Sequence, residues 1–262
     1  MKQISESVWR YHDAFGCTSY LVVGKNRAAM IDCGMSAGPV MPMIREITQL
    51  PVDLLLTHAH PDHYGAAAEF ERLWMHEADI AALEDMEPVF AGMGVAPLPR
   101  EKLCAFSDGH VFDLGGAQLL AAELAGHTPG SSVFVYEAEE MIFSGDAVGS
   151  GDIVLMAVPQ AYDLGRYACS LRAFLGRSTA WDGFSWHAGH WHQAERGEGQ
   201  ERNDPCRELI EDMATLCDMI LEGRVTGEEV QEPFAPRGQA RRAYYGRAGI
   251  VYCDHQLVKR LT

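Results

Sequence analysis

The chain has no long hydrophobic run, no closely spaced cysteine pair and few basic residues for its size. Its apolar stretches fall well short of the roughly 20 residues that span a membrane, and its first ten residues lack the apolar segment of a secretory signal. We therefore expect no membrane partner. Lys and Arg total 21 against 37 Asp and Glu, and the resulting net charge of −16 disfavours a nucleic-acid partner.

The cysteines are odd in number and scattered, and none forms a C-x-x-C motif. A chain of 262 residues can bury a sizeable core and does not need disulfide bonds to fold. This usage favours a reducing compartment, so we expect a cytoplasmic location. The seven positions are Cys17, Cys33, Cys104, Cys169, Cys206, Cys217 and Cys253.

The composition is that of an ordinary globular protein, at 47% hydrophobic and 22% charged. We expect a catalytic domain over residues 1–194 and a C-terminal helix and tail, residues 195–262, packed on that same domain. The polar, glycine-containing segment 195–204 indicates a linker. Residues 205–222 that follow have the apolar spacing of an amphipathic helix.

The densest chemical motif is Thr57-His58-Ala59-His60-Pro61-Asp62-His63-Tyr64-Gly65. The apolar run 52–56 before it predicts a buried strand, and the run from Gly65 to Trp74 predicts a helix. The histidines therefore lie on a strand-to-helix loop. Four such side chains would be costly as ordinary packing, because each buried polar group needs a partner.

The spacing within this motif gives it a geometric meaning. Residues two apart in extended chain lie about 6.6 Å apart and point the same way, so His58 and His60 can converge on one cation. Pro61 fixes its own φ and turns the chain, which directs Asp62 and His63 toward a second point beside the first. The motif thus predicts most of a two-metal site.

Other patterns predict the framework around it. Antiparallel hairpins are expected over residues 19–34, 110–124 and 133–143, and a short helix over 42–50. A further strand is expected over 73–76, with a structural His76, followed by a helix over 77–86. The segment 87–100, rich in Pro, Gly and Met, is either a loop lining a substrate pocket or an ordinary connection.

Three later motifs add candidate ligands. His127 stands in the rigid loop Gly126-His-Thr-Pro-Gly130, and Asp146 closes an apolar strand, where a carboxylate can bridge two cations. Of the last three histidines, His187, His190 and His192, we favour His190 because the preceding glycine lets the backbone approach a crowded site. Asp32, at another strand end, is either a support for a ligand loop or a turn residue.

Two features bear on the substrate. The segment Arg237–Arg247 is the only concentrated basic stretch, and it either clamps an anionic substrate group or forms a solvated surface patch. Tyr162 and Tyr167 can each donate a hydrogen bond to a developing oxyanion, although tyrosine is also common in cores.

Together, His-x-His-x-Asp-His, Gly-His-Thr-Pro-Gly-Ser, Ser-Gly-Asp and Gly-His occur in an order that resembles the metallo-β-lactamase-fold hydrolase superfamily, over roughly residues 17 to 192. The resemblance implies an α/β fold, a four-layer αβ/βα sandwich of two mixed sheets. It places His58, His60 and His127 on a first metal, and Asp62, His63 and His190 on a second. Asp146 would bridge the two, and Asp32 would buttress the site.

The implied function is that of a dinuclear metal-dependent hydrolase. A metal-bridging hydroxide would attack an ester, thioester or lactone-type carbonyl, with Asp62 and Asp146 as the catalytic carboxylates. The cofactors would be two divalent metal ions, with zinc favoured and iron or manganese as alternatives. We expect a small-molecule substrate, with an anionic substrate and a homo-oligomer left open. The alternative is a mononuclear iron persulfide dioxygenase of the same fold, which uses only the first three histidines.

Overall fold

The computed structural model describes the chain except for residues 36–37, 150–152, 192–204, 236–238 and 259–262. Its first sheet begins with antiparallel pairs and becomes parallel from β4 onward. The strand order is β1 (Lys2–Gln3), β2 (Val8–His12), β3 (Thr18–Val23), β4 (Ala28–Ile31), β5 (Val52–Leu55), β6 (Leu73–His76) and β7 (Leu103–Phe106).

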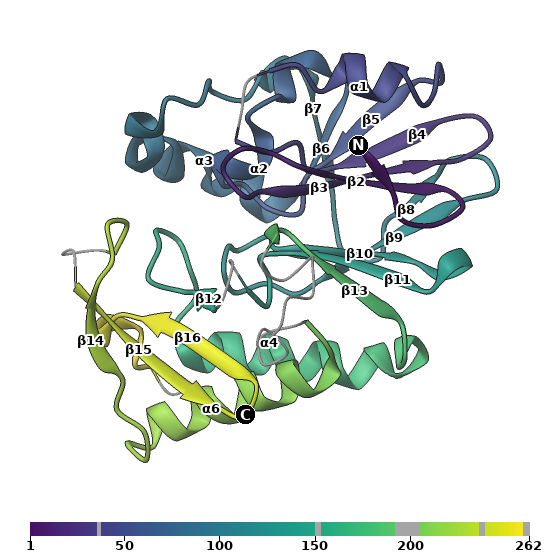
Figure 1. Ribbon diagram of the computed structural model, residues 1–262. Helices are drawn as coiled ribbons and strands as arrows, with labels where there is room; N and C mark the ends of the chain where they lie inside the picture. The colour runs from purple at the N-terminus through teal and green to yellow at the C-terminus, as the bar shows by residue number, and fades with distance from the viewer. Residues whose placement is uncertain (36–37, 150–152, 192–204, 236–238, 259–262) are drawn as a thin grey trace.

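A second sheet lies against the first (Figure 1). Its neighbours are antiparallel except for β11 and β13, which run parallel. The strand order is β13 (Ser185–Ala188), β11 (Met141–Gly145), β10 (Ser132–Tyr136), β9 (Gln118–Glu123) and β8 (Val111–Asp113).

The alternation of side chains along the strands explains why the two sheets stack. On β3 and β4, Tyr20 and Ile31 belong to the apolar layer between the sheets, together with Phe134 and Phe143 of the second sheet. Their neighbours in sequence point to the opposite face, because successive strand residues alternate. Each sheet therefore has a second apolar face, and helices cover it.

Helices on the two outer faces complete four layers (Figure 1). α1 (Met41–Arg45) and α3 (Glu77–Phe90) pack on the first sheet, where Ile44 and Leu83 meet Leu54. α4 (Leu164–Arg177) and α6 (Arg207–Leu221) pack on the second sheet and on each other, with Leu171 and Met213 in their shared core. The expected αβ/βα sandwich is confirmed.

A third sheet, which the sequence did not reveal, is built mainly from the C-terminal segment. Its order is β12 (Val154–Leu155), β16 (Ala248–Tyr252), β15 (Gln239–Tyr245) and β14 (Glu228–Gln231). Ala243, Ala248 and Ile250 join the apolar core around α4 and α6. The other face buries Val251 and Ala235 in a smaller cluster. The C-terminal tail is thus attached to the main body in two ways: its side chains pack in the core around α4, and its strand β16 pairs with β12.

The segment after the histidine motif differs from its prediction. Instead of a helix over 65–74, only α2 (Pro61–Tyr64) and the 3-10 turn η1 (Ala67–Glu69) form. Gly65 explains this, because its N–H donates to the carbonyl of Gly34 at 2.6 Å, and an added Cβ would lie 2.2 Å from the carbonyl oxygen of Met35. A close backbone contact thus overrides the helix propensity of the alanine run.

The segment 87–100 also differs from its prediction, because its first residues belong to a helix and not to a loop. α3 continues past Met86 through Pro88 and ends at Phe90, followed by the 3-10 turns η2 (Ala91–Met93) and η3 (Arg100–Lys102). The boundary expected at 194–195 lies outside the described residues. Among the helices that the structure describes, none has both the length and the apolar character needed to cross a bilayer.

Candidate metal centre

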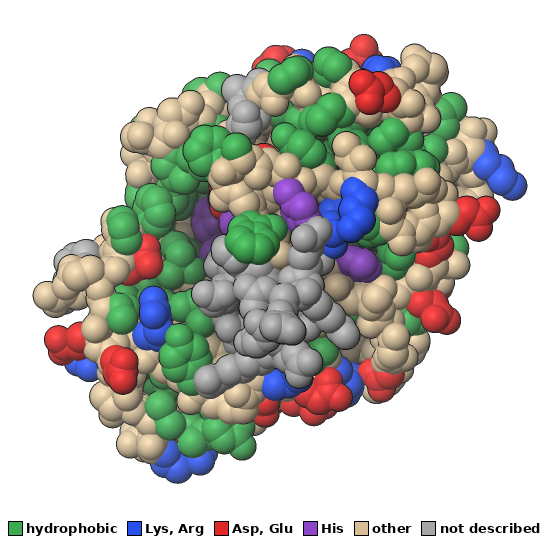
Figure 2. Space-filling model, in the orientation of Figure 1, with side chains coloured by type: hydrophobic (Ala, Val, Ile, Leu, Met, Phe, Trp, Pro, Cys, Tyr) green, Lys and Arg blue, Asp and Glu red, His purple; other side chains and the backbone are tan. Residues whose placement is uncertain are grey.

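All the candidate ligands follow the C-terminal ends of strands that meet at one edge of the two sheets. In parallel strands these ends lie on the same side, which is where α/β folds place their sites. Figure 2 shows histidine side chains reaching the surface on one face of the molecule. Asp32 follows β4, residues 57–63 follow β5, His127 follows β9, Asp146 follows β11 and His190 follows β13.

Three histidines form the first cluster. The ring centroids of His58, His60 and His127 lie 4.5 to 4.9 Å apart, and all three side chains are buried. One ligand atom from each lies within 4.8 Å of the others. His60 has extended backbone, with φ −92° and ψ 144°, and Pro61 then starts α2. This turn separates the first cluster from the next two ligands, as the spacing predicted.

Asp62, His63, Asp146 and His190 form the second cluster, again with ligand atoms within 4.8 Å of one another. Asp146 lies between the clusters. Its Oδ2 is 3.2 Å from Nε2 of His190 and 3.8 Å from Nε2 of His127, and its Oδ1 is 3.5 Å from Nε2 of His63. The structure therefore brings all seven predicted ligands together, with one carboxylate shared.

The pattern of unused hydrogen-bonding atoms fits metal ions. Buried polar atoms in proteins almost always have a partner. The described residues leave buried polar atoms without a hydrogen-bond partner at several places, and five of these atoms are ligand atoms of the two clusters. They are Nε2 of His58, His60, His63 and His127, and Oδ1 of Asp146. Imidazole nitrogen and carboxylate oxygen are the donors that zinc, iron and manganese accept.

Asp32 supports the second cluster and the histidine loop together. Its Oδ2 accepts hydrogen bonds from Nδ1 of His63 and Oγ1 of Thr57, both at 2.8 Å, and its Oδ1 accepts from the Thr57 N–H at 2.8 Å. Its backbone has a φ of 54°, which is rare outside glycine and is tolerated where the surroundings hold it. Asp32 was expected to be either a support for a ligand loop or a turn residue, and these hydrogen bonds match the first alternative.

The glycine before His190 has the role expected of it. A Cβ on Gly189 would lie 2.6 Å from Oδ1 of Asp146 and 2.8 Å from His63, so a larger residue would displace ligands. His187 lies elsewhere, packed edge-on against Tyr20, with its Nε2 3.1 Å from Oγ of Ser185. His192 lies outside the described residues.

Asp79 is a functional candidate that the sequence reasoning missed. Fully buried on α3, it accepts hydrogen bonds from the N–H of Ala59 at 2.8 Å, the N–H of Gly130 at 2.6 Å and Oγ1 of Thr128 at 2.8 Å. It thereby joins the loop of His58 and His60 to the loop of His127. One signal was available, because Asp79 extends the apolar stripe of α3 at helical spacing.

Main-chain and tyrosine contacts fix the His127 loop further. Nδ1 of His127 is 2.7 Å from the carbonyl oxygen of Leu155 on β12, to which it donates, and this leaves Nε2 free for a cation. Tyr167 donates to the carbonyl of Ala147 at 2.8 Å, and Tyr162 to that of Pro129 at 3.3 Å. Both hydroxyls thus brace the site loops.

Burial sets the protonation of the first cluster. It lowers the pKa of His58 and of His60 well below the usual histidine value, and neighbouring imidazoles add to the effect. Burial also lowers the pKa of His127. All three are therefore neutral near pH 7, which is the form that binds a metal.

In the second cluster, neighbouring carboxylates raise the histidine pKa values instead of leaving them lowered by burial. Burial alone would lower the pKa of His63 and His190, but Asp146 and Asp62 outweigh it and raise both. Burial would raise the pKa of Asp146, yet His190 and His63 hold it well below the usual range. Without a cation, the two carboxylates attract protons onto their histidine neighbours.

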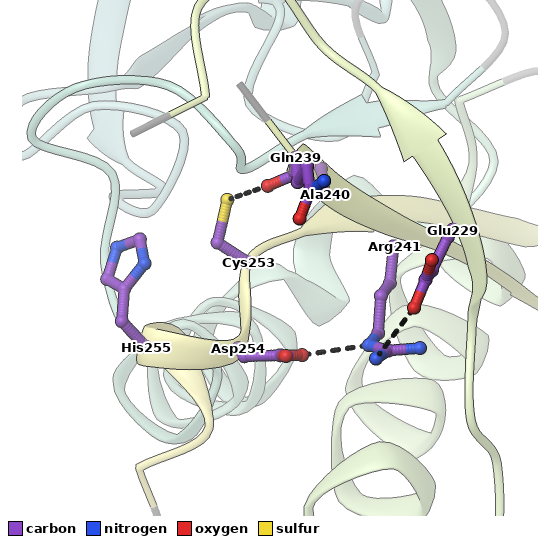
Figure 3. Close-up of a pocket in the computed structure, with 7 residues that line it drawn as sticks. All are labelled: Glu229, Gln239, Ala240, Arg241, Cys253, Asp254 and His255. Carbon is purple, nitrogen blue, oxygen red and sulfur yellow. Dashed lines mark hydrogen bonds and ion pairs between the residues drawn. The ribbon is translucent and has the colours of Figure 1, made fainter. Parts of the chain in front are cut away.

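The other charged candidates lie outside the two clusters. Nδ1 of His76 accepts from the N–H of Ala78 at 3.2 Å and caps α3, which matches its expected structural role. In the basic segment, Arg241 donates to Asp254 at 2.8 Å and lies 3.4 Å from Glu229, in a small pocket shown in Figure 3. None of the seven predicted metal ligands is among the residues that line this pocket.

A family comparison agrees with this geometry. Residues 12–192 match the family described as the Metallo-beta-lactamase superfamily. The chain belongs to this superfamily. The matched range contains all seven ligand candidates and Asp79. It starts at the end of β2 and ends before α6 and the last three strands, so it includes β3 to β7 of the first sheet and the whole second sheet.

Curated relatives in the superfamily have hydrolase names. "Probable metallo-hydrolase YqgX" of Bacillus subtilis is 27% identical over 52% of this chain and 67% of its own length. "Acyl-coenzyme A thioesterase MBLAC2" of Gallus gallus is 28% identical over 52% of this chain and 58% of its own. "Hydroxyacylglutathione hydrolase GloC" of Haemophilus influenzae is 30% identical over 49% and 65%. The chain thus spans roughly three fifths to two thirds of these relatives.

Solved structures of the superfamily share the fold. A metallo-beta-lactamase from Pontibacter korlensis aligns with a TM-score of 0.59 at 19% identity, over 83% of this chain and 97% of the other. A structure titled TTHA1623 in a di-iron-bound form aligns with a TM-score of 0.54 at 24% identity, over 70% and 91%. At these identities the likeness concerns the fold alone.

Proposed function

We propose that this metallo-β-lactamase superfamily member is a dinuclear metal-dependent hydrolase that cleaves the carbonyl of a small-molecule thioester or related ester. One observation carries the proposal. Two ligand clusters meet at Asp146, whose oxygens lie 3.2 to 3.8 Å from histidines of both. A single-metal site would not need the second cluster to be complete.

The ligand assignment follows from the clusters. The first ion would be held by His58, His60 and His127, and the second by Asp62, His63 and His190, with Asp146 between them. Zinc is the favoured metal, because it takes imidazole and carboxylate ligands together, while iron and manganese suit the same donors.

Two divalent ions held there would lower the pKa of water to about 7 and polarise a carbonyl oxygen. The residues of the chain supply the rest. Asp62, with 24% of its side chain exposed, is the carboxylate that solvent and substrate can reach, so it can accept and return a proton. Asp146 is 3% exposed and is suited to bridging. Asp32, Asp79 and the Leu155 carbonyl keep the imidazoles oriented.

The relatives' names support a thioester substrate in particular. One is an acyl-coenzyme A thioesterase and another a hydroxyacylglutathione hydrolase, and both names describe thioester cleavage. Simple esters and lactones share the electrophilic carbonyl and remain within the proposed class. The cytoplasmic location, the anionic character of the substrate and a homo-oligomeric state stay predictions.

The mononuclear iron persulfide dioxygenase is the competing proposal. It would use the first cluster alone, and it would leave Asp62 and His190 without a role. The completeness of the second cluster favours the hydrolase.

Elemental analysis of protein purified without added metal is the first test. About two zinc, iron or manganese ions per chain, together with thiol release from a thioester, would support the dinuclear hydrolase. About one iron per chain, with oxygen consumption on a persulfide, would replace it with the dioxygenase. No bound metal, even after reconstitution, would overturn both.

His58→Ala serves as the matched variant, with His187→Gln as the control from the same histidine-rich edge. The first should lose metal and thioester hydrolysis, and the second should keep both, because His187 lies in neither cluster.

A further inference from the structure

An aromatic pair lies beside the first ligand cluster, formed by Phe90 and Phe234. The ring of Phe90 is 5.1 Å from the ring of His60, and the ring of Phe234 is 5.3 Å from that of Phe90. Phe90 ends α3, whereas Phe234 lies between β14 and β15 of the third sheet. Two distant parts of the chain thus form one apolar surface next to a ligand. We name the pair the aromatic wall.

The two members of the wall differ in exposure. Phe90 is buried, with 6% of its surface accessible, while Phe234 is only half-buried. Both belong to the hydrophobic cluster on the outer face of the first sheet, which Met93 and Val95 also join as half-buried residues. The wall therefore starts at a ligand and continues outward to accessible apolar surface. Figure 2 shows hydrophobic side chains beside the surface histidines.

Charged groups near the wall include one neutralising pair and the Glu232 carboxylate, which accepts a hydrogen bond from the N–H of Phe234. Arg100 donates to Glu87 at 2.7 Å, so this pair at the two ends of the 87–100 segment has no net charge. Val89, next to Phe90, is 47% exposed. An apolar ligand group could lie against the two rings without separating the Arg100–Glu87 pair.

We propose that the aromatic wall binds the acyl chain of a thioester substrate, so that the enzyme prefers medium-length apolar acyl groups to acetyl. This inference rests on the proposed function and specifies its substrate. The two halves of a thioester differ in polarity, because biological carrier thiols are polar and charged while many acyl groups are hydrocarbon. Of these halves, the hydrocarbon acyl chain gains more from burial against phenyl rings than a charged, polar carrier does.

The wall also explains why the third sheet matters to the site. Leu155 of β12 holds His127, and Phe234 of the β14–β15 connection covers Phe90 beside His60. The third sheet therefore contacts His127 of the first cluster through β12, and lies beside His60 through the β14–β15 connection. A specificity role follows from the second contact.

The test compares straight-chain thioesters of one small thiol, N-acetylcysteamine, from acetyl to octanoyl, on the metal-loaded full chain. Full burial of one methylene group raises kcat/KM by about fourfold. Because the wall is partly exposed, we expect each methylene to raise kcat/KM by roughly twofold. We expect kcat/KM to rise along the series in the wild type. In Phe234→Ala the octanoyl value should fall roughly tenfold while the acetyl value stays within about twofold.

Tyr245→Ala is the matched control, since it removes an exposed aromatic ring from β15 of the same sheet and lies outside the wall. It should keep the wild-type chain-length dependence. Phe90→Leu, which preserves most of the buried volume, should show a weaker form of the Phe234→Ala effect. A flat chain-length profile in the wild type, or an equal loss for acetyl and octanoyl in Phe234→Ala, would overturn the proposal.

A binding measurement separates this inference from the proposed hydrolysis. The octyl thioether of N-acetylcysteamine cannot be hydrolysed, and calorimetry on the wild type and on Phe234→Ala should show binding that is roughly tenfold weaker in the variant. If no thioester is cleaved at any chain length, the proposed function fails, and this binding difference alone then decides whether the wall recognises acyl chains. Equal binding by both proteins would reject it.

Discussion

The two ligand clusters lie side by side and share Asp146, yet their surroundings differ. The first consists of three neutral, buried imidazoles whose pKa values burial has lowered. The second contains two carboxylates, and its Asp62 and His190 are partly exposed, at 24% and 16% of the side chain. The first cluster is therefore in the neutral form that binds a cation, whereas the carboxylates of the second raise the pKa values of its histidines, and only Asp62 and His190 reach solvent.

The residues that hold the two clusters in place also differ. The first cluster is held by contacts that cross the fold, from Asp79 on α3 and from Leu155 on β12. The second is held by Asp32 at the adjacent strand end and by an isolated bridge between Cys17 and His190. Asp32 also reaches His58 through Thr57, so the first half-site adds contacts between layers to a strand-end support that the second half-site uses directly. Four substitutions test this contrast.

Asp146→Ala should have the largest effect, because its carboxylate approaches histidines of both clusters. We expect loss of more than one metal per chain and a fall in hydrolysis of at least roughly 100-fold, which exceeds the 10- to 100-fold typical of residues that only orient ligands. Metal content by elemental analysis and kcat/KM provide the readouts. Retention of both metals would refute the shared role of Asp146.

Asp32→Asn should affect the second cluster more than the first, because Asp32 bonds His63 directly and reaches His58 only through Thr57. The amide cannot match the carboxylate that accepts from Nδ1 of His63, so His63 loses its orientation. We expect affinity for one metal equivalent to fall roughly 10- to 100-fold while the affinity for the other equivalent falls less. A titration followed by calorimetry would show this as the loss of one of two binding steps. Equal weakening of both steps would contradict the separation of supports.

Asp79→Asn should destabilise the loops of the first cluster in a pH-dependent way. Burial raises the pKa of Asp79 to about 6 from 3.8, so the folded state holds this proton more tightly than the unfolded state. The resulting stabilisation is complete below about pH 4 and is lost as the pH rises through about 6. The variant, which lacks one acceptor, should be less stable by about 1–3 kcal/mol at pH 4.

This deficit should shrink toward pH 7, because the wild type alone loses up to roughly 3 kcal/mol over that range. Denaturant unfolding of chelator-treated protein at several pH values would measure the gap. A constant gap would mean that Asp79 does not titrate between pH 4 and pH 7.

His187→Gln should have the smallest effect. Its ring lies against Tyr20 and Phe143 and outside both clusters, and burial lowers its pKa to about 4, so it is neutral at pH 7. Metal content and hydrolysis should stay within about twofold of the wild type, with at most a modest loss of stability. Loss of a metal equivalent would reassign the last ligand of the second cluster.

Local sequence patterns predicted a large part of the framework. The alternating runs located the β3–β4 and β10–β11 hairpins and the short strand β6, because strand formation there depends on residues that are close in sequence. The histidine motif predicted that His58 and His60 would belong to one cluster and Asp62 and His63 to another, because Pro61 turns the chain between them. These features need no knowledge of the distant chain.

Contacts across the fold could not be predicted in the same way. The role of Asp79 depends on Gly130, and the orientation of His127 depends on β12, which pairs with the C-terminal β16. The helix expected after Gly65 was wrong because a backbone contact with Gly34 opposes it. Each miss involves a partner far away along the chain, where periodicity carries no information.

The pairing of β12 with β16 has a consequence for the order of assembly. Leu155, whose carbonyl orients His127, pairs with Val251 near the end of the described chain. During synthesis, the histidine loops leave the ribosome before β16 does, so we expect the ring of His127 to be fixed in its final orientation after β16 has paired with β12. We therefore expect metal to bind the first cluster tightly only once β16 has paired with β12.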